Sequence, residues 1–488
     1  MQLYAHNHGH QFLYKLSILD LQASTIFCGL VSYSEVRDAE VRREGMNRFV
    51  KGALLLMFAA FLGECLEFII NVVLAKELGE EGLGLYMSIF PTIAFIVVIA
   101  SLELPISISK FVAEKEPIFH YSMLKHALWF ATLCTVAFTA IALFLFPLIP
   151  VFEKYHPFVK WLFIVLIPVI TFSSVARGYF MGAQKMAKIA VANFIRRAVQ
   201  LGFLVLIFHF FDFDLQTSIL IGLCAVIVCE MAVLAYLILA FVGQMKSFRK
   251  QPRAEMSAKK VRKSLLEVSL PTTGLRIFHA ATFAIKPFLI KAALVKAGMA
   301  ESMAIIQYGK LAGVAFTIGF FPAFIAHSLL IVLIPTVSEA YSKRNYDELH
   351  NLLRKVLMFT GFYGFPIVAV FYLFAGELTT LFFENSPAAG YLQLLVPYFL
   401  FHYFVIPMQA YLIGLGLVKD AFIHSVITTA ISFVMMFMLG AMPAFGMSGV
   451  ILGMNMSAVL LTFLHYATIC KKLGLSWTLK REQLGDLR

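Results

Sequence analysis

Charged residues are scarce in this chain of 488 residues: 14% are Asp, Glu, Lys or Arg, whereas 60% are hydrophobic. A soluble globular domain has about 25% charged and about 45–50% apolar residues, so the composition excludes an ordinary soluble protein. The mean hydropathy of +0.83 agrees, because the apolar excess extends along the whole chain. A polytopic membrane protein is the class that fits.

Cysteine is also scarce, with six residues and no CxxC pair. Metal sites and disulfide frameworks need cysteines at characteristic spacings, so we expect buried free thiols and neither a metal nor a cofactor. The chain also lacks DxD, Walker and nucleophile-elbow motifs, and the loops expected outside the membrane are short, which argues against an enzyme.

The first 45 residues differ from the rest, because they lack the apolar core and cleavage site of a signal peptide. We expect residues 1–45 to be a disordered or mis-annotated extension. "RREG" at Arg42–Gly45 can be encoded by a purine-rich stretch that resembles a ribosome-binding site. It lies immediately before Met46, so we expect the mature protein to begin at Met46.

Twelve apolar runs are long enough to cross about 30 Å of hydrocarbon as helices. They predict an all-α polytopic membrane protein with two lobes of six helices. The expected spans are 52–75, 86–109, 123–149, 158–181, 189–211, 216–242, 266–295, 309–338, 353–376, 391–414, 421–440 and 446–469.

Basic residues set the expected orientation. The loop Gly243–Ser264 carries eight basic residues and one acidic residue, which places it in the cytoplasm by the positive-inside rule. Six spans lie on each side of it, so both termini are expected in the cytoplasm of a bacterial cell. The net charge of +12 is assigned to this signal and not to nucleic-acid binding. The expected parts are an N-terminal lobe 46–242, a basic linker 243–265, a C-terminal lobe 266–469 and a basic tail 470–488.

The two halves resemble each other in sequence at nearly constant offsets. A parallel repeat of six helices predicts lobes related by a pseudo-two-fold axis along the membrane normal, with a site between them. The matching pairs are "FIINVVLAK" at 68–76 with "FLIKAALVK" at 288–296, "LPISISKF" at 104–111 with "IPTVSEAY" at 334–341, and "YFMGAQ" at 179–184 with "YLIGLG" at 411–416.

Ionisable residues within the expected helices are the leading candidates for function, since charges in hydrocarbon are costly. Glu64 and Glu67 lie on one face of the first helix. Arg276, His279 and Lys286 fall within an arc of about 80° on the seventh helix, which is the counterpart of the first. We expect both faces to line a cavity between the lobes.

Three interpretations of these charges stay open. The basic face can bind an anionic headgroup such as a diphosphate. Glu64 and Glu67, together with Glu103 on the second helix, can form a proton or sodium site. Alternatively, opposite charges neutralise each other across the lobes and hold a closed state. Arg196 and Arg197 lie near the start of the fifth helix, and we expect their long side chains to reach the membrane surface.

Three segments carry a family resemblance. "NRFVKGALLLMFAAFLGECLEFIINVVLAKELGEEGLGLYMSIFPTIAFIVVIASLELPISISKFVAE", "ARGYFMGAQKMAKIAVANFIRRAVQ" at 176–200 and "SLPTTGLRIF" at 269–278 resemble the stage V sporulation protein B-like polysaccharide flippases. This family belongs to the multidrug, oligosaccharidyl-lipid and polysaccharide exporter superfamily. The similarity extends from Met46 to about Trp477. One departure is "GECLEF" in the first helix, where the family carries a basic turn.

The resemblance implies a two-lobe transporter resembling the multidrug and toxin extrusion (MATE) proteins. It implies that the chain flips a lipid-linked oligosaccharide or peptidoglycan-type precursor by alternating access, for envelope or spore cortex synthesis. The implied partner is an anionic polyprenyl-linked glycan lipid, and we expect a monomer. The alternatives are a proton- or sodium-coupled multidrug or cation antiporter and, from another class, an integral-membrane glycan polymerase or glycosyltransferase.

Overall fold

The computed structural model describes residues 58, 61–148, 150–248, 257–384 and 388–477. Within these ranges, twelve helices are long and apolar enough to cross a membrane, so the predicted all-α membrane fold is confirmed. Large apolar side chains remain exposed on the helices, with Phe362 at 82% and Leu239 at 74%, as expected of surfaces that face lipid. The predicted extension 1–45 and the start at Met46 lie outside the described residues.

The first two predicted spans form a single helical stretch that reverses direction. Residues 61–101 are helical, and Gly79 interrupts them with a φ of 66°, a left-handed conformation that glycine adopts without a steric penalty. Leu74 and Tyr86 lie on opposite sides of this glycine, yet both side chains reach Gly222 of α6 (Leu215–Phe248). The chain therefore folds back at Gly79, and the two arms pack side by side.

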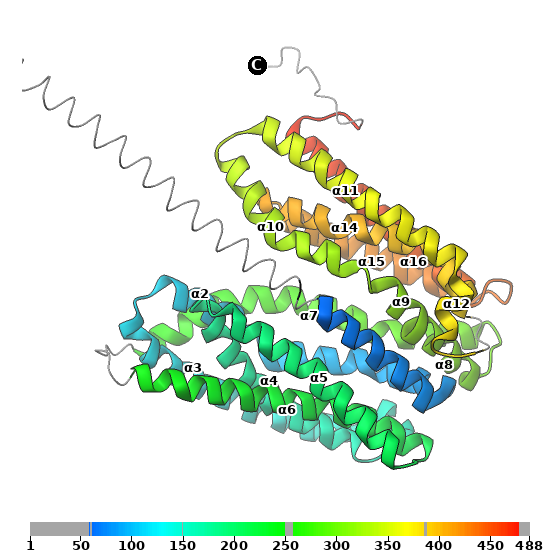
Figure 1. The fold of residues 1–488 in the computed structure, drawn as a ribbon, viewed down its shortest axis with the longest axis horizontal. Helices are drawn as coiled ribbons and strands as arrows, with labels where there is room; N and C mark the ends of the chain where they lie inside the picture. The colour runs from blue at the N-terminus through cyan, green and yellow to red at the C-terminus, as the bar shows by residue number, and fades with distance from the viewer. Residues whose placement is uncertain (1–57, 59–60, 149, 249–256, 385–387, 478–488) are drawn as a thin grey trace, which may run out of the picture. The chain divides into compact units, whose positions relative to one another are not determined.

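The first bundle is completed by five helices that are coloured from cyan to green in Figure 1. The most extensive contacts within it join α2 to α4, α4 to α6 and α5 to α6. Two short 3₁₀ turns, η1 (Phe146–Leu148) and η2 (Pro150–Lys154), connect α3 to α4. The helices are α2 (Leu104–Glu114), α3 (Pro117–Leu145), α4 (Val159–Gly182), α5 (Met186–Phe210) and α6 (Leu215–Phe248).

The second bundle contains the helices coloured from yellow-green to red in Figure 1. Its main contacts join α15 to α16, α10 to α14 and α14 to α16. The elements are α8 (Glu301–Gly309), the π-helical turn η3 (Lys310–Ala315), α9 (Phe316–Phe320), α10 (Ala323–Ser342), α11 (Tyr346–Leu373), α12 (Ala375–Thr380), α13 (Ala388–Leu394), α14 (Val396–Gly414), α15 (Val418–Gly440) and α16 (Met447–Leu473).

The predicted span 309–338 is wrong in its extent, because the structure has a longer and broken helix there. Glu301–Phe320 and Ala323–Ser342 are separate apolar stretches that meet at Phe321 and Pro322. Proline has no backbone N–H to continue the helical hydrogen bonding, which accounts for the interruption. The π-helical turn adds a second irregularity within the first stretch.

Helix α7 (Ala258–Lys296) contacts both bundles. It packs against α2 and α3 of the first bundle and against α8 and α15 of the second. It begins at Ala258 and not near residue 266, and α6 continues to Phe248, so helices occupy much of the predicted linker 243–265. Residues 249–256 of that linker lie outside the described residues.

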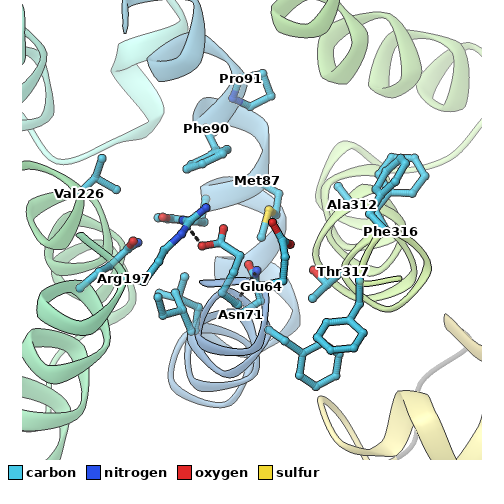
Figure 2. Close-up of a pocket in the computed structure, with 18 of the residues that line it drawn as sticks. Glu64, Asn71, Met87, Phe90, Pro91, Arg197, Val226, Ala312, Phe316 and Thr317 are labelled. Atoms are coloured by element: carbon cyan, nitrogen blue, oxygen red, sulfur yellow. Dashed lines mark hydrogen bonds and ion pairs between the residues drawn. The ribbon is translucent and has the colours of Figure 1, made fainter. Parts of the chain in front are cut away.

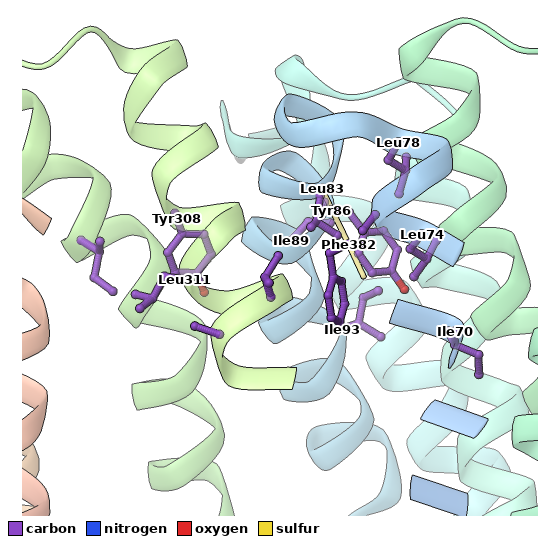
Figure 3. Close-up of a cluster of buried hydrophobic side chains, with 14 of the residues drawn as sticks. Ile70, Leu74, Leu78, Leu83, Tyr86, Ile89, Ile93, Tyr308, Leu311 and Phe382 are labelled. Carbon is purple, nitrogen blue, oxygen red and sulfur yellow. The ribbon is translucent and has the colours of Figure 1, made fainter. Parts of the chain in front are cut away.

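A buried apolar cluster joins the first bundle to α8 and η3. Ile70, Leu74 and Tyr86 from the 61–101 helix belong to the same cluster as Tyr308 and Leu311. Figure 3 shows Tyr308 and Leu311 on one side of the cluster, Ile89 and Tyr86 in its middle, and Leu74 and Ile70 on the other side. The two bundles are therefore held together in part by continuous apolar packing.

Small residues allow close helix packing at three GxxxG sequences, as this spacing predicts. At Gly182 of the 178–182 pair, an added Cβ would lie 2.5 Å from the carbonyl oxygen of Ser109 in α2. At Gly449 of the 449–453 pair it would lie 2.5 Å from the carbonyl oxygen of Leu439 in α15. The third pair, 309–313, lies where the bundles meet.

Candidate functional site

A cavity of about 300 Å³ lies between the two bundles. One wall is formed by the 61–101 helix, α5 and α6, and the other by α7, α8, η3 and α9. Figure 2 shows Glu64 and Arg197 on one side, with Ala312, Phe316 and Thr317 facing them from the other bundle. The cavity therefore lies between the N-terminal and C-terminal halves of the described chain.

The first wall carries five charged side chains. Arg197 of α5 forms an ion pair with Glu67, and the Arg196 Nε lies 3.3 Å from an oxygen of Glu230 in α6. Glu64 lines the same space one helical turn from Glu67, and no ion pair involving Glu64 is recorded within the described ranges. The wall thus holds two ion pairs and one further carboxylate, Glu64, on which both Arg197 and Glu67 act electrostatically.

The structure does not bear out the expectation that Arg196 and Arg197 extend to the membrane surface. Both side chains line the cavity and contact carboxylates of other helices. The physical reason is that a carboxylate within reach in a low-dielectric region offers a stronger interaction than a distant interface. Glu67 and Glu230 supply these partners, and they come from helices far apart in the sequence.

The second wall is aromatic and carries one cation. Lys286 of α7 lines the cavity beside Phe283, and among the described residues it has no recorded ion pair. Phe316, Phe320 and Phe321 form much of the remaining surface. This wall can bind an anion at Lys286 and the apolar face of a sugar ring or lipid on its phenylalanines.

Of the three bases predicted on one face of the seventh helix, the structure brings only Lys286 to this cavity. The Arg276 guanidinium donates to Glu103 at 2.6 Å, and the His279 ring lies edge-on against Phe422 of α15. Arg276 and Lys286 share a helical face, but ten residues separate them by about 15 Å along the axis. The predicted basic face is therefore divided between two locations.

Glu103 occupies a break in its helix. Leu102 and Glu103 have φ values of 47° and 51°, a left-handed conformation that is strained for residues with a side chain. The carboxylate is buried, with 2% of the side chain exposed, and Arg276 is its ion-pair partner. The break therefore directs Glu103 toward α7, away from the cavity that Glu64 and Glu67 line.

The bundles touch backbone to backbone at Gly84 and Gly309. A Cβ added at Gly309 would lie 2.6 Å from the Gly84 Cα, so this contact requires glycine. Lys310, whose side chain is 7% exposed, forms an ion pair with Glu80 at 2.7 Å beside the contact. Sequence reasoning missed Lys310; the signal was a lysine in an apolar run beside the 309–313 glycine pair.

The variant Gly309→Val is expected to separate the bundles at this contact, because the side chain cannot fit against the Gly84 backbone. We expect a cysteine at Thr317, in a chain without native cysteines, to react several times faster with an impermeant thiol reagent added on the Gly84 side. Gly202→Val is the matched control, because its Cβ would meet nothing within 4 Å. An unchanged rate in Gly309→Val would show that the contact does not limit access.

Comparisons with known proteins agree with this architecture. The polysaccharide biosynthesis protein family matches residues 49–341, and the MatE family matches residues 297–431. The solved structure of an inward-facing multidrug resistance MATE family transporter of the MOP superfamily aligns with a TM-score of 0.69 at 15% identity, over 86% of this chain and 96% of that one. This likeness concerns the fold.

Two curated relatives come from Bacillus subtilis (strain 168). Sporulation protein YkvU is 55% identical over 88% of this chain and 97% of its own length. Stage V sporulation protein B is 30% identical over 90% of this chain and 86% of its own length. With this identity, the family match over residues 49–341 and the MATE fold, the chain belongs to the polysaccharide biosynthesis protein family of multi-pass membrane proteins.

Proposed function

We propose that this chain is a flippase that moves a lipid-linked oligosaccharide or peptidoglycan-type precursor across the cell membrane by alternating access. Its product is consumed in envelope or spore cortex synthesis. The observation that carries the proposal is the cavity between the bundles, which Lys286, Arg196 and Arg197 all line. Membership of the polysaccharide biosynthesis family and the sporulation relatives support the same class of cargo.

The cations of the cavity provide the chemistry for a phosphate-bearing headgroup. Lys286 offers an ammonium that forms no ion pair with a carboxylate among the described residues. Arg197 offers a guanidinium whose geometry suits two phosphate oxygens. Glu67 holds Arg197 while the cavity is empty, and an entering phosphate takes its place. The phenylalanines of the opposite wall pack against the first sugar.

Transport then requires the contact at Gly84 and Gly309 to open. The ion pair of Glu80 with Lys310 stabilises this contact. Binding of the headgroup then shifts the equilibrium between the closed and the open state. With the basic loop Gly243–Ser264 in the cytoplasm, both termini are cytoplasmic and Gly84 lies toward the outer surface. We further propose that one chain is sufficient, because both walls of the cavity come from it.

A reconstituted system tests the proposal. The purified full chain in liposomes is given a fluorescent polyprenyl diphosphate sugar, and an impermeant reductant reports how much lipid changes leaflet. We expect Lys286→Gln to lower the rate about tenfold, because it removes the unpaired cation of the cavity. Lys286→Arg retains the charge and should retain most activity. Lys419 is an exposed lysine of α15, so Lys419→Gln is the control for the loss of one charge.

Equal rates in liposomes with and without the chain would reject the flippase. Release of a glycan product from the labelled lipid would favour the polymerase or glycosyltransferase. Equal rates for the unchanged chain and Lys286→Gln would reject the anion site while leaving the flippase in place.

A second candidate is a proton- or sodium-coupled multidrug or cation antiporter. The observation that favours it is Glu64, a cavity carboxylate for which no ion-pair partner is recorded within the described ranges, one helical turn from Glu67. Two carboxylates at this spacing can share a proton or hold a sodium ion when Glu67 is released from Arg197. Efflux of a cationic dye that follows an imposed gradient and is lost in Glu64→Gln would support the antiporter.

A further inference from the structure

We propose that an apolar groove and an adjoining lysine-rich cavity, both outside the cavity described above, form one binding site for a polyprenyl phosphate. The groove takes the isoprenoid chain and the lysines take the phosphate. This inference rests on the proposed function for its choice of lipid. The observation behind it is that Phe288 of α7 lines both spaces.

The groove lies among the 61–101 helix, α3, α4 and α7 and has a volume of about 360 Å³. Thr92 is the one polar residue among those that line it. Ile141 lines its α3 side and is 52% exposed, so the groove is accessible from the lipid-facing surface of that helix. Such a surface binds an apolar chain and nothing charged.

The adjoining cavity has a volume of about 650 Å³ and a positive balance of charge. Lys154 of η2 and both Lys291 and Lys296 of α7 line it, whereas Glu301 is its single carboxylate. Glu301 forms an ion pair with Lys154. Lys291 forms no ion pair within 4 Å in the described ranges, but Glu301 and Lys154 both act on it electrostatically. Its ammonium lies 5.1 Å from the centre of the Phe288 ring, and three lysines share one carboxylate in this cavity.

An apolar groove that ends at three lysines with a single carboxylate among them matches a lipid with one anionic end. An anionic phosphate oxygen balances the excess of lysines and accepts a short charge-assisted hydrogen bond from Lys291, while Glu301 stays paired with Lys154. The isoprenoid chain then leaves the phosphate past Phe288 and enters the groove. Packing of the isoprenoid chain in the groove adds van der Waals contacts that a free phosphate does not make.

The lysine cavity adjoins the closed contact between the bundles. Leu85 lines the cavity and follows Gly84 directly, and its carbonyl oxygen accepts a hydrogen bond from Tyr155 at 2.9 Å. A headgroup that passes the opened Gly84 contact therefore arrives beside Lys291. This location suits a site that holds the carrier lipid as it leaves the central cavity.

Binding without transport tests the site. The purified full chain in nanodiscs of neutral phosphatidylcholine is titrated with polyprenyl phosphate carrying a fluorescent terminal isoprene. We expect Lys291→Gln and Ile141→Trp each to raise the Kd about tenfold, because one removes the ammonium and the other fills the groove. Leu143→Trp, on an exposed position of α3 outside the groove, and Lys125→Gln, an exposed lysine of the same helix, are the matched controls.

Two results would overturn the proposal. One is an unchanged Kd in both Lys291→Gln and Ile141→Trp. The other is equal competition by phosphatidylglycerol, which would make the site one for bulk anionic lipid. The binding assay does not depend on flipping. Loss of binding in Lys291→Gln therefore supports this site even where the unchanged chain fails to flip lipid, a result that rejects the proposed function alone.

Discussion

The variant Arg197→Gln is expected to lower lipid flipping about tenfold or more, because it removes the guanidinium that we assign to the phosphate and leaves Glu67 uncompensated. The leaflet-exchange assay in liposomes measures this. Arg197→Lys should recover part of the rate, since it restores the charge without the bidentate geometry.

A double variant separates two roles of Arg197. In Arg197→Gln with Glu67→Gln both charges of the ion pair are absent, so any penalty from an unpaired carboxylate disappears. We expect this double variant to stay inactive, because the phosphate still lacks its guanidinium. Recovery of transport would show instead that Arg197 serves only to neutralise Glu67. That result would favour the interpretation in which opposite charges neutralise each other and hold a closed state.

The variant Arg276→Ala is expected to lower both transport and stability, because it leaves Glu103 buried without its partner. A fully buried pair broken in this way costs about 3–5 kcal/mol, but Arg276 is 57% exposed, so we expect a loss of about 1–2 kcal/mol. Thermal unfolding in detergent, followed by the reaction of a dye with exposed thiols, measures the change.

The double variant Arg276→Ala with Glu103→Gln should recover most of the lost stability. The neutral amide no longer needs a cation at this buried position. A chain that remains as unstable as Arg276→Ala would show that Arg276 acts through its packing against α2 and not through its charge.

The membrane class and the number of helices could be predicted from the sequence because both depend on the length and composition of apolar runs. The GxxxG pairs were equally readable, since each reports a local need for small side chains. The positions of the helix breaks could not be predicted from the sequence. The span predicted at 86–109 runs across Leu102 and Glu103, whose left-handed conformation leaves no mark in the apolar pattern.

The members of the candidate site were predictable as a set of embedded charges, but their pairing was not. Periodicity places Glu64 and Glu67 on one face, yet it cannot show that Arg197 of α5 faces them. The angular position of a residue around a helix also says nothing about its position along the helix axis. Periodicity therefore groups Arg276 with Lys286, although the two residues lie at different heights along α7. Contacts between helices distant in sequence decide both questions.

Protection of the cavity by a cargo headgroup is the most direct measurement of the central claim, that the space between the bundles holds a phosphate-bearing glycan lipid. A cysteine at Thr317, in a full chain without native cysteines, is labelled in nanodiscs with and without polyprenyl diphosphate sugar. The account predicts slower labelling at Thr317 with the lipid, and unchanged labelling of a cysteine at exposed Lys419. Equal labelling of Thr317 with and without saturating lipid would contradict it.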